Sequence, residues 1–286
     1  MIKKIFFGLL MILLLSVVTV YAAPTDSYSE QIVQSGGRVK FDCTVIKPWL
    51  SEPANYQYPV IAWANGWDTN NNDTTAGYKP GLIEWALDGP YIVVAANSRS
   101  PKEGDLLNCL QWVVNKNSVR GSDLYGVVNM AKIGLVGHSQ GGGVAINAGD
   151  GEPNGFNITA VAAMNPYAPN WNDANSQDGP VMVIGGTADT VTPVTTYTQP
   201  AWEAIRAGDK GGLMAMLQGG DHNSDAWAPP GVDPTTTNFG NYQTITNLWW
   251  QFHLNDNASA GRALKKIFDQ YPWVTEYEFT QFFQLP

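Results

Sequence analysis

The sequence predicts an α/β protein built on one mostly parallel central sheet with helices on both faces. Short apolar runs alternate along the chain with segments whose apolar residues recur at helical spacing, which is the pattern of such a sheet. The run 132–136 leads directly into a glycine-rich turn and then into the small residues of 142–146, as a strand followed by a closely packed helix would. No Pro- or Ser-rich linker and no internal repeat divides the 286 residues, so we expect one large domain.

The predicted strands and helices follow one another from the N-terminal third of the chain onward. After an early strand over 37–46, the strands are short, mostly apolar runs, as in strands buried on both faces: 59–64, 91–96, 132–136, 158–164, 181–184 and 213–217. The helices are amphipathic segments between or after these runs: 81–87, 105–114, 199–207, 242–254 and 258–268. The second of them, for example, repeats Leu106, Leu107 and Leu110 on one face.

The turn after the run 132–136 reads Gly137-His138-Ser139-Gln140-Gly141 and predicts a nucleophile elbow. In such a strand-to-helix turn the backbone of the serine is strained, its hydroxyl is pushed into a cleft, and the flanking residues are glycines because a Cβ would clash. The alternative is a Gly-rich turn that closes an ordinary α/β unit. The strand before and the small residues after the turn favour Ser139 as the nucleophile.

The order of elements around this turn is that of an α/β-hydrolase fold. A lid or cap of this fold is usually inserted between the two strands that follow the nucleophile, and here only the short loop 165–180 lies between them. We therefore expect no lid domain and a cleft open to solvent, which suits bulky or polymeric substrates.

The N-terminus predicts a secretory signal peptide over residues 1–22. Lys3 and Lys4 precede an apolar stretch of about 16 residues, shorter than the roughly 20 of a spanning helix, and small residues follow at the cleavage site. A single transmembrane anchor is the alternative. Cleavage would leave one domain over 23–286, secreted or periplasmic, with no stable membrane span; we expect a monomer.

The charge of the chain argues against nucleic acid as a partner. Lys and Arg number 16 against 25 Asp and Glu, and the leader contains two of the lysines and no acid, so the mature chain would carry about −11. Phosphate binding requires a basic face instead. The polar run 69–75 shows no spacing typical of a cation site, and we expect neither a metal nor another cofactor.

The two cysteines, Cys43 and Cys109, have no zinc-site spacing. In an exported chain they are candidates for a disulfide that closes a long loop. The alternative is two unpaired thiols in the core.

A serine hydroxyl needs an adjacent base, and the chain has three histidines from which to choose. His138 lies inside the elbow and is expected to point away from the hydroxyl of its neighbour. His253 lies on an amphipathic helix, where a packed or surface histidine is ordinary. His222 lies in the polar loop 219–224 after a strand, and we predict it to be the base.

The orienting acid should lie between the serine and the histidine in the chain, at the end of a strand. Asp189 follows the run 181–184 through a glycine turn and is the predicted acid. Its rivals are Asp173 and Asp178, in the loop before that strand, and Asp221, next to His222.

The oxyanion hole is predicted to consist of two backbone N–H groups. One belongs to Gln140, the residue after the nucleophile. The other is expected from the loop after the strand 59–64, where Asn65 and Gly66 allow the chain to turn and Trp67 is the candidate donor.

Aromatic residues make up 12% of the chain and include 11 tryptophans, most of which should lie in the core. Trp67 and Tyr167, on loops at the carboxyl ends of strands, could instead flank Ser139 and bind an apolar or aromatic acyl group. Trp171 is a third candidate. For each of the three, packing is the alternative role.

With these motifs in place, the chain resembles the lidless secreted α/β-hydrolases of the cutinase and polyethylene terephthalate hydrolase type, and the related chlorophyllase-like and dienelactone-hydrolase-like esterases. The matching segments run in the expected order: 61–66, 93–97, 137–143, 186–193 and 219–222. The resemblance implies that Ser139, Asp189 and His222 form a catalytic triad and that the segment 165–167 places an aromatic ring beside the acyl group.

Two departures from this resemblance concern the substrate. Gln140 stands where polyesterases often have methionine, and Trp67 replaces a smaller tyrosine. Polyester hydrolysis therefore does not follow from the match. The expected function is a secreted, cofactor-free serine carboxylic-ester hydrolase of the cutinase or polyesterase type. The alternatives are a lipase or small-ester esterase and, in another class, a non-catalytic ligand-binding protein of the same fold.

Overall fold

The computed structural model describes residues 28–34, 42–48, 56–67, 77–150, 155–208, 210–223 and 238–280. The predicted signal peptide, 1–22, and the polar run 69–75 lie outside these residues.

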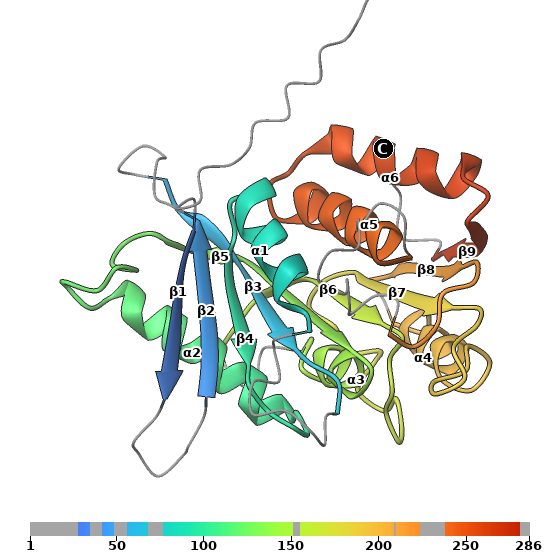
Figure 1. Cartoon of the computed structure of the whole chain (residues 1–286), viewed down its shortest axis with the longest axis horizontal. Coiled ribbons are helices and arrows are strands. Elements are labelled where there is room, and N and C mark those ends of the chain that lie inside the picture. The colour runs from blue at the N-terminus through green and yellow to red at the C-terminus, as the bar shows by residue number, and fades with distance from the viewer. Residues whose placement is uncertain are drawn as a thin grey trace, which may run out of the picture.

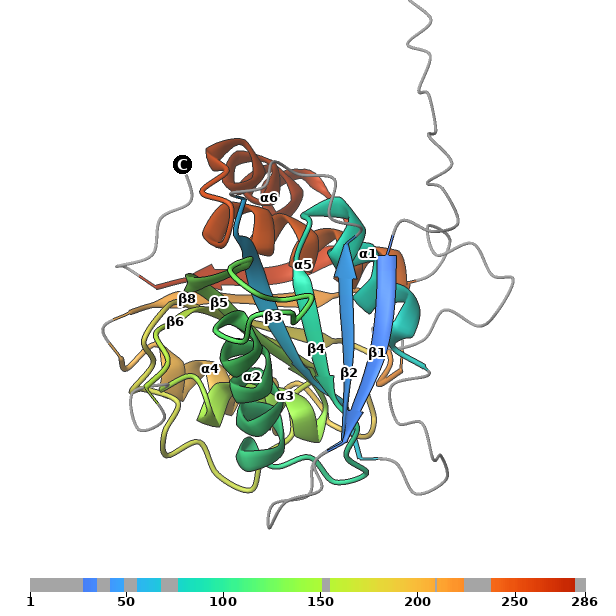
Figure 2. The same ribbon diagram turned by 90° about the vertical axis from the view of Figure 1, so that its left-hand side faces the viewer.

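Within the described residues, nine strands form one sheet in the order β1-β2-β4-β3-β5-β6-β7-β8-β9. The central six, from β4 to β8, are parallel to one another, while β1, β2 and β9 pair antiparallel at the two edges (Figures 1 and 2). The strands are β1 (Tyr28–Gln34), β2 (Asp42–Pro48), β3 (Tyr58–Ala64), β4 (Ile92–Ala96), β5 (Val128–His138), β6 (Ile158–Met164), β7 (Val181–Gly186), β8 (Gly212–Leu217) and β9 (Val274–Phe279).

Six helices cover the two faces of this sheet in the described part of the chain (Figure 1). Side chains of α2 (Glu103–Asn117), α3 (Gln140–Asn147) and α4 (Thr198–Ile205) join one apolar cluster with one face of the strands. Side chains of α1 (Lys79–Asp88), α5 (Asn238–His253) and α6 (Ala258–Gln270) join a second cluster on the other face. The predicted α/β fold, mostly parallel with helices on both faces, is confirmed.

The alternation of faces follows from the apolar strands themselves. In β3, Ala62 contributes to the first cluster and Trp63 to the second, because successive side chains of a strand point to opposite faces. A strand buried on both faces has no polar position, which is why β3, β4 and β7 read as continuous apolar runs.

The prediction was incomplete at the edges of the sheet. Neither β1 nor β9 was predicted, since their sequences mix polar and apolar residues, and β9 leaves much of its length exposed. The strand expected over 37–46 is observed as β2, from 42 to 48, with 35–41 outside the described residues. The strand before the elbow begins at Val128 and is therefore longer than the apolar run 132–136 that predicted it.

The segment between β6 and β7 contains turns but no helix or strand, as expected for a fold without a lid at this point. Gln177 holds the segment on α3 by donating its side-chain N–H to the carbonyl oxygen of Ile146 at 2.8 Å. The same amide donates to the carbonyl oxygen of Asp173 at 3.0 Å. The loop therefore stays close to the sheet.

Cys43 of β2 and Cys109 of α2 form a disulfide whose Cα atoms lie 5.8 Å apart. The bond joins the antiparallel edge of the sheet to a helix that packs on it.

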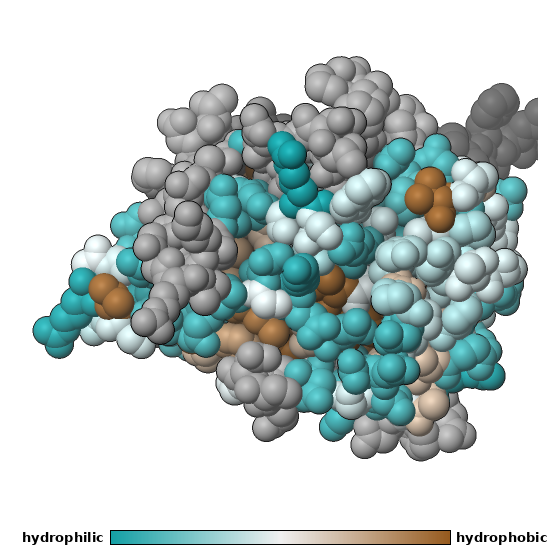
Figure 3. All heavy atoms as spheres, turned by 90° about the horizontal axis from the view of Figure 1, so that it is seen from below, coloured by the Kyte–Doolittle hydropathy of each residue, from teal (hydrophilic) through white to brown (hydrophobic). Residues whose placement is uncertain are grey.

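No helix of the described residues has both the length and the apolar character needed to cross a membrane. On the side where α2, α3 and α4 lie in Figure 1, the coloured surface is largely hydrophilic, and hydrophobic atoms show only in small separate areas (Figure 3).

Candidate active site

Ser139 occupies a sharp turn between the last residue of β5 and the first residue of α3. Its backbone has φ 53° and ψ −123°, a strained conformation for a residue with a side chain. Only glycine fits on either side: a Cβ on Gly141 would collide with the carbonyl oxygen of Ala64, and one on Gly137 with that of Gly141. The backbone around Ser139 is therefore a nucleophile elbow in its geometry.

The elbow brings Ser139 next to His222, which in turn contacts Asp189. His222 Nε2 lies 3.0 Å from Ser139 Oγ, and His222 Nδ1 lies 2.8 Å from Asp189 Oδ2. The side chain of Asp189 is fully buried, that of His222 is 12% exposed, and Ser139 is 9% exposed, so solvent reaches this row at its His222 and Ser139 end. The three residues predicted from the sequence as nucleophile, base and acid are thus brought together.

Asp189 receives four hydrogen bonds after the turn that follows β7. Its Oδ1 accepts the backbone N–H groups of Val191 and Thr192, both at 2.8 Å. Its Oδ2 faces His222 Nδ1 and accepts the Thr192 hydroxyl at 2.7 Å. Burial would raise the pKa of this carboxyl, but the hydrogen bonds from His222 and Thr192 outweigh it and lower the pKa to about 2. Asp189 is therefore ionised at neutral pH.

Thr192 is a residue of this site that the sequence analysis missed. Its hydroxyl oxygen lies 3.1 Å from His222 Nδ1, besides its contact with Asp189 and a bond to the carbonyl oxygen of Asn165 at 3.0 Å. A threonine three residues after an aspartate in a turn is a common local hydrogen-bonding pattern. That spacing was the available signal.

Asn165 is a second such residue, buried and in the left-handed region with φ 43°. Its Oδ1 accepts the N–H of Gly186 at 2.8 Å and the hydroxyl of Tyr242 at 3.1 Å. Its Nδ2 donates to the carbonyl oxygen of Asp221 at 3.2 Å. Asn165 therefore ties the end of β6 to the end of β7 and to the loop of His222. An asparagine directly after an apolar strand was the sequence signal.

The two other histidines do not reach Ser139 Oγ as bases. The ring nitrogens of His138 contact the Tyr78 hydroxyl and the carbonyl oxygen of His222 instead. His253 packs on Trp249 with ring centroids 4.1 Å apart, and its carbonyl oxygen accepts the ammonium of Lys132 near the start of β5. Burial lowers the pKa of both imidazoles to about 3, so both are neutral.

The hydrogen bonds described for the rival acids involve other groups than His222. Asp178 Oδ2 accepts the N–H of Ile158, at the opposite end of β6 from the elbow. Asp221 Oδ1 accepts the N–H of Asn223 in its own loop. The carbonyl oxygen of Asp173 accepts hydrogen bonds from Ser176 and Gln177 in the exposed loop before β7.

The two predicted oxyanion donors belong to backbone segments beside Ser139. Gln140 is the first residue of α3, so its N–H has no acceptor within the helix, and its side chain donates away from the cleft to Ser100 and Pro101. Gly66 lies so close to the elbow that a Cβ on it would be 3.2 Å from the Cβ of Ser139. The next residue, Trp67, is 66% exposed and ends that stretch of described residues.

The three candidate binding aromatics differ in their surroundings. Tyr167 donates its backbone N–H to the carbonyl oxygen of Ser139 at 2.8 Å, while its ring is 41% exposed and contacts Tyr197. Trp67 is also exposed. Trp171 is half-buried against the core, which is a packing position.

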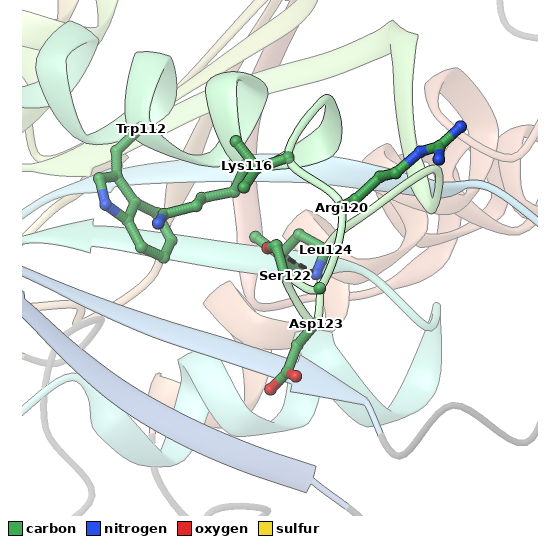
Figure 4. Close-up of a pocket in the computed structure, with 8 residues that line it drawn as sticks. Trp112, Lys116, Arg120, Ser122, Asp123 and Leu124 are labelled. Atoms are coloured by element: carbon green, nitrogen blue, oxygen red, sulfur yellow. Dashed lines mark hydrogen bonds between the residues drawn. The ribbon is translucent and has the colours of Figure 1, made fainter.

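A hollow of about 320 Å³ opens beside the last turn of α2 and the loop that leads into β5 (Figure 4). Trp112, Lys116, Arg120 and Asp123 line it, and the Lys116 ammonium lies 5.3 Å from the centre of the Trp112 ring. This loop precedes the first residue of β5, whereas Ser139 follows the last. The hollow is therefore separate from the candidate active site.

In the described residues, no group of three or more His, Cys, Asp or Glu side chains is arranged to hold a metal.

Comparisons with known proteins agree with this geometry. The PET hydrolase-like family matches residues 82–233, more than half of the chain, and the match includes Ser139, Asp189 and His222. A bis(hydroxyethyl) terephthalate hydrolase of Streptomyces coelicolor is 26% identical over 127 residues, which make up 44% of this chain. The alignment covers 36% of the length of that relative. The matched segments carry the α/β-hydrolase fold.

Proposed function

This chain belongs to the PET hydrolase-like family, and we propose that it is a serine carboxylic-ester hydrolase that acts through Ser139, His222 and Asp189. The observation that carries the proposal is the row of hydrogen bonds from a buried, ionised carboxylate through His222 to a serine on a strained turn. A structural serine needs neither the strain nor the imidazole.

In the proposed reaction, Ser139 Oγ attacks the ester carbonyl while His222 Nε2 takes its proton. Asp189 holds the other ring nitrogen, so that Nδ1 carries a proton and Nε2 accepts one. The backbone N–H groups of Gln140 and Trp67 are the proposed donors to the oxyanion. His222 then gives the proton to the leaving alcohol, and water, activated by the same imidazole, releases the acid from Ser139.

The substrate class that we propose is an ester with a flat or bulky acyl group, as in cutinases and polyesterases. The exposed rings of Tyr167 and Trp67, on backbone segments beside Ser139, support it, as does the absence of a lid between β6 and β7. The relative named for bis(hydroxyethyl) terephthalate supports an aromatic acid in particular. A lipase or a small-ester esterase, the alternative, would differ from such an enzyme in the length of the acyl chain that it prefers.

We further propose that the enzyme is exported as a cofactor-free monomer after removal of residues 1–22. The charge and apolar pattern of that leader support export. An oxidising compartment would also suit the disulfide between Cys43 and Cys109.

The test is hydrolysis of short p-nitrophenyl esters by the wild type and by Ser139→Ala, His222→Ala and Asp189→Asn. We expect Ser139→Ala and His222→Ala to lose activity by about 10⁴-fold or more, and the double variant Ser139→Ala/His222→Ala to lose no more than either alone, because the residues act as a unit. Asp189→Asn should lose at least about 10³-fold.

An organophosphonate that labels active serines completes the experiment, with labelling located by mass spectrometry of peptides. His253→Phe is the matched control, since it alters a histidine of α5 that contacts Lys132, about 23 Å before Ser139 along β5, and should leave turnover unchanged. Near-native turnover by folded Ser139→Ala would refute the mechanism. A wild type that neither turns over esters nor takes the label would instead be a non-catalytic member of the fold.

A further inference from the structure

His138 precedes the nucleophile, but its ring is directed away from the serine hydroxyl. The residue is buried at 2% exposure, at the end of β5. Its Nδ1 lies 2.8 Å from the hydroxyl oxygen of Tyr78, and its Nε2 lies 2.7 Å from the carbonyl oxygen of His222. The two imidazole rings are neighbours, with centroids 4.7 Å apart. His138 thus contacts the backbone of the proposed base.

The directions of these hydrogen bonds follow from one carbonyl group. A carbonyl oxygen only accepts, so the Nε2 of His138 must carry a proton and donate it to His222. Burial and the neighbouring His222 lower the pKa of His138 to about 3, and a neutral ring with a proton on Nε2 has none on Nδ1. The Tyr78 hydroxyl must therefore donate to Nδ1.

The same hydroxyl continues the row to the loop after β3. Having given its proton to His138, Tyr78 Oη accepts the backbone N–H of Gly66 at 3.1 Å. Gly66 directly precedes Trp67, the proposed oxyanion donor, and lies against the elbow. Three hydrogen bonds that all run in one direction thus connect the proposed oxyanion loop to the loop of the proposed base.

We propose that His138 is a positioning residue that holds the backbone of His222, and through Tyr78 the loop of Gly66, in register with Ser139; the proposal rests on the function proposed above. The loop of His222 has a second tether at Asp221, whose carbonyl oxygen accepts Asn165 Nδ2. The two tethers hold consecutive peptide groups, so losing the one at His222 leaves the imidazole able to swing about the one at Asp221. Such a swing lengthens the contact of Nε2 with Ser139 Oγ.

Three variants test separately the hydrogen bond of His138 to His222 and the hydrogen bonds of Tyr78. His138→Phe keeps a ring in place and removes both hydrogen bonds. His138→Gln keeps an N–H near the position of Nε2 and therefore restores the bond to His222. Tyr78→Phe keeps the ring against Trp63 and removes only the hydroxyl. His253→Phe is the control for replacing a buried histidine by phenylalanine far from the site.

The measurements are thermal unfolding, kcat and KM on p-nitrophenyl acetate, the rate of phosphonate labelling of Ser139, and the low-field NMR resonance of the His222 Nδ1 proton. For folded His138→Phe we expect kcat and the labelling rate to fall about 10- to 100-fold, KM to stay within about twofold, and the resonance to shift or broaden. His138→Gln should keep kcat within about threefold of the wild type, and Tyr78→Phe should fall between the two.

A folded His138→Phe with wild-type kcat and labelling rate would overturn the proposal, as would a His138→Gln variant no better than His138→Phe. If His138→Phe does not fold, the same measurements on the other two variants test the proposal. His138→Gln should then keep kcat within about threefold of the wild type, and Tyr78→Phe should have a lower kcat than His138→Gln. Failure of the proposed function looks different, because the wild type itself would then neither hydrolyse the ester nor be labelled at Ser139.

Discussion

Tyr167 is held by its backbone while its ring remains at the surface. The N–H of Tyr167 donates to the carbonyl oxygen of Ser139, and a Cβ on Gly143 would collide with the carbonyl oxygen of Tyr167. The ring is 41% exposed and contacts the ring of Tyr197, with centroids 5.1 Å apart. A ring anchored beside the proposed nucleophile and open on one face is suited to lie against a flat acyl group.

Replacing Tyr167 by alanine should therefore affect esters of aromatic or long-chain acids more than acetates. We expect kcat/KM to fall by the equivalent of about 1–2 kcal/mol more for a benzoate or long-chain ester than for an acetate. The measurement is kcat/KM on a matched series of p-nitrophenyl esters. Tyr125→Ala is the control, since this similarly exposed tyrosine lies in the loop before β5, at the far end of the sheet. Equal losses on all esters would mean that Tyr167 only packs against Tyr197.

Much of the candidate site could be predicted from the sequence because three of its residues have local signatures. Ser139 has the elbow, and Asp189 and His222 each follow an apolar strand in the expected chain order. The partners of these residues could not be predicted, since Asn165 and His138 act on backbone groups 56 and 84 residues away. Which carbonyl a buried side chain reaches depends on the packing of strands, and no short motif records it.

At the scale of elements, the disulfide joins the two layers at one edge of the sheet. Cys43 lies on β2, opposite Ala96 of β4, and Cys109 lies on the buried face of α2. Both cysteines are fully buried. The bond closes a loop with a sequence separation of 66 residues, which restricts the unfolded chain considerably.

The double variant Cys43→Ala/Cys109→Ala should lose about 4 kcal/mol of unfolding free energy, the value that chain entropy assigns to a loop of this size. Urea titration under non-reducing conditions measures it. The wild type unfolded in the presence of dithiothreitol is the matched control and should approach the variant. Equal stability of the oxidised and reduced wild type would show that the bond contributes nothing measurable, and any loss in the double variant would then come from the missing side-chain volume.

The central elements could be predicted and the edge strands could not, for a physical reason. A parallel strand covered on both faces must be apolar throughout, so β3, β4 and β7 stand out from the polar sequence around them. An edge strand such as β9 keeps exposed positions and pairs with one neighbour only. Its sequence, Val-Thr-Glu-Tyr-Glu-Phe, therefore resembles that of many surface segments.

At the scale of the whole molecule, four partly or fully buried side chains in the described part of the chain have shifted pKa values that affect how stability responds to acid. Burial lowers the pKa of His138 and His253 from 6.5 to about 3, and hydrogen bonds lower that of Asp189 from 3.8 to about 2. Burial, together with the charge of Asp88, raises the pKa of Glu84 from 4.5 to about 7. A group whose pKa is lowered in the fold contributes stability at pH values above its pKa in the unfolded chain, and this contribution is lost as the pH falls. For Glu84, whose pKa is raised, the protonated form is favoured in the fold, and its contribution is lost as the pH rises towards 7.

The free energy of unfolding should therefore fall as the pH is lowered below 6.5, and more steeply below 4.5. Between these values the unfolded chain takes up two histidine protons, while folded Glu84 already holds one that unfolded Glu84 lacks. Folded Glu84 thus offsets part of this uptake, and solvent screening of its partly exposed carboxyl makes the offset smaller than one proton. Below 4.5 Glu84 is protonated in both states and offsets nothing, so the free energy of unfolding falls more steeply with falling pH.

Urea titrations at pH 7, 5.5, 4.5 and 3.5 measure these slopes. His253→Phe should reduce the slope below pH 4.5 by about half, because one of the two histidine protons is then missing from the balance. A stability that stays constant from pH 7 to 4 would contradict the burial of both imidazoles in neutral form.

The wide spacing of Ser139, Asp189 and His222 along the chain has a consequence for synthesis. His222 is made 83 residues after Ser139, and the strand β9 that closes the sheet beside β8 comes about 50 residues later still. Under the proposed mechanism, a nascent chain that ends before His222 therefore lacks the base for Ser139. We expect such truncated products of translation to be inert towards esters in the cell that makes them.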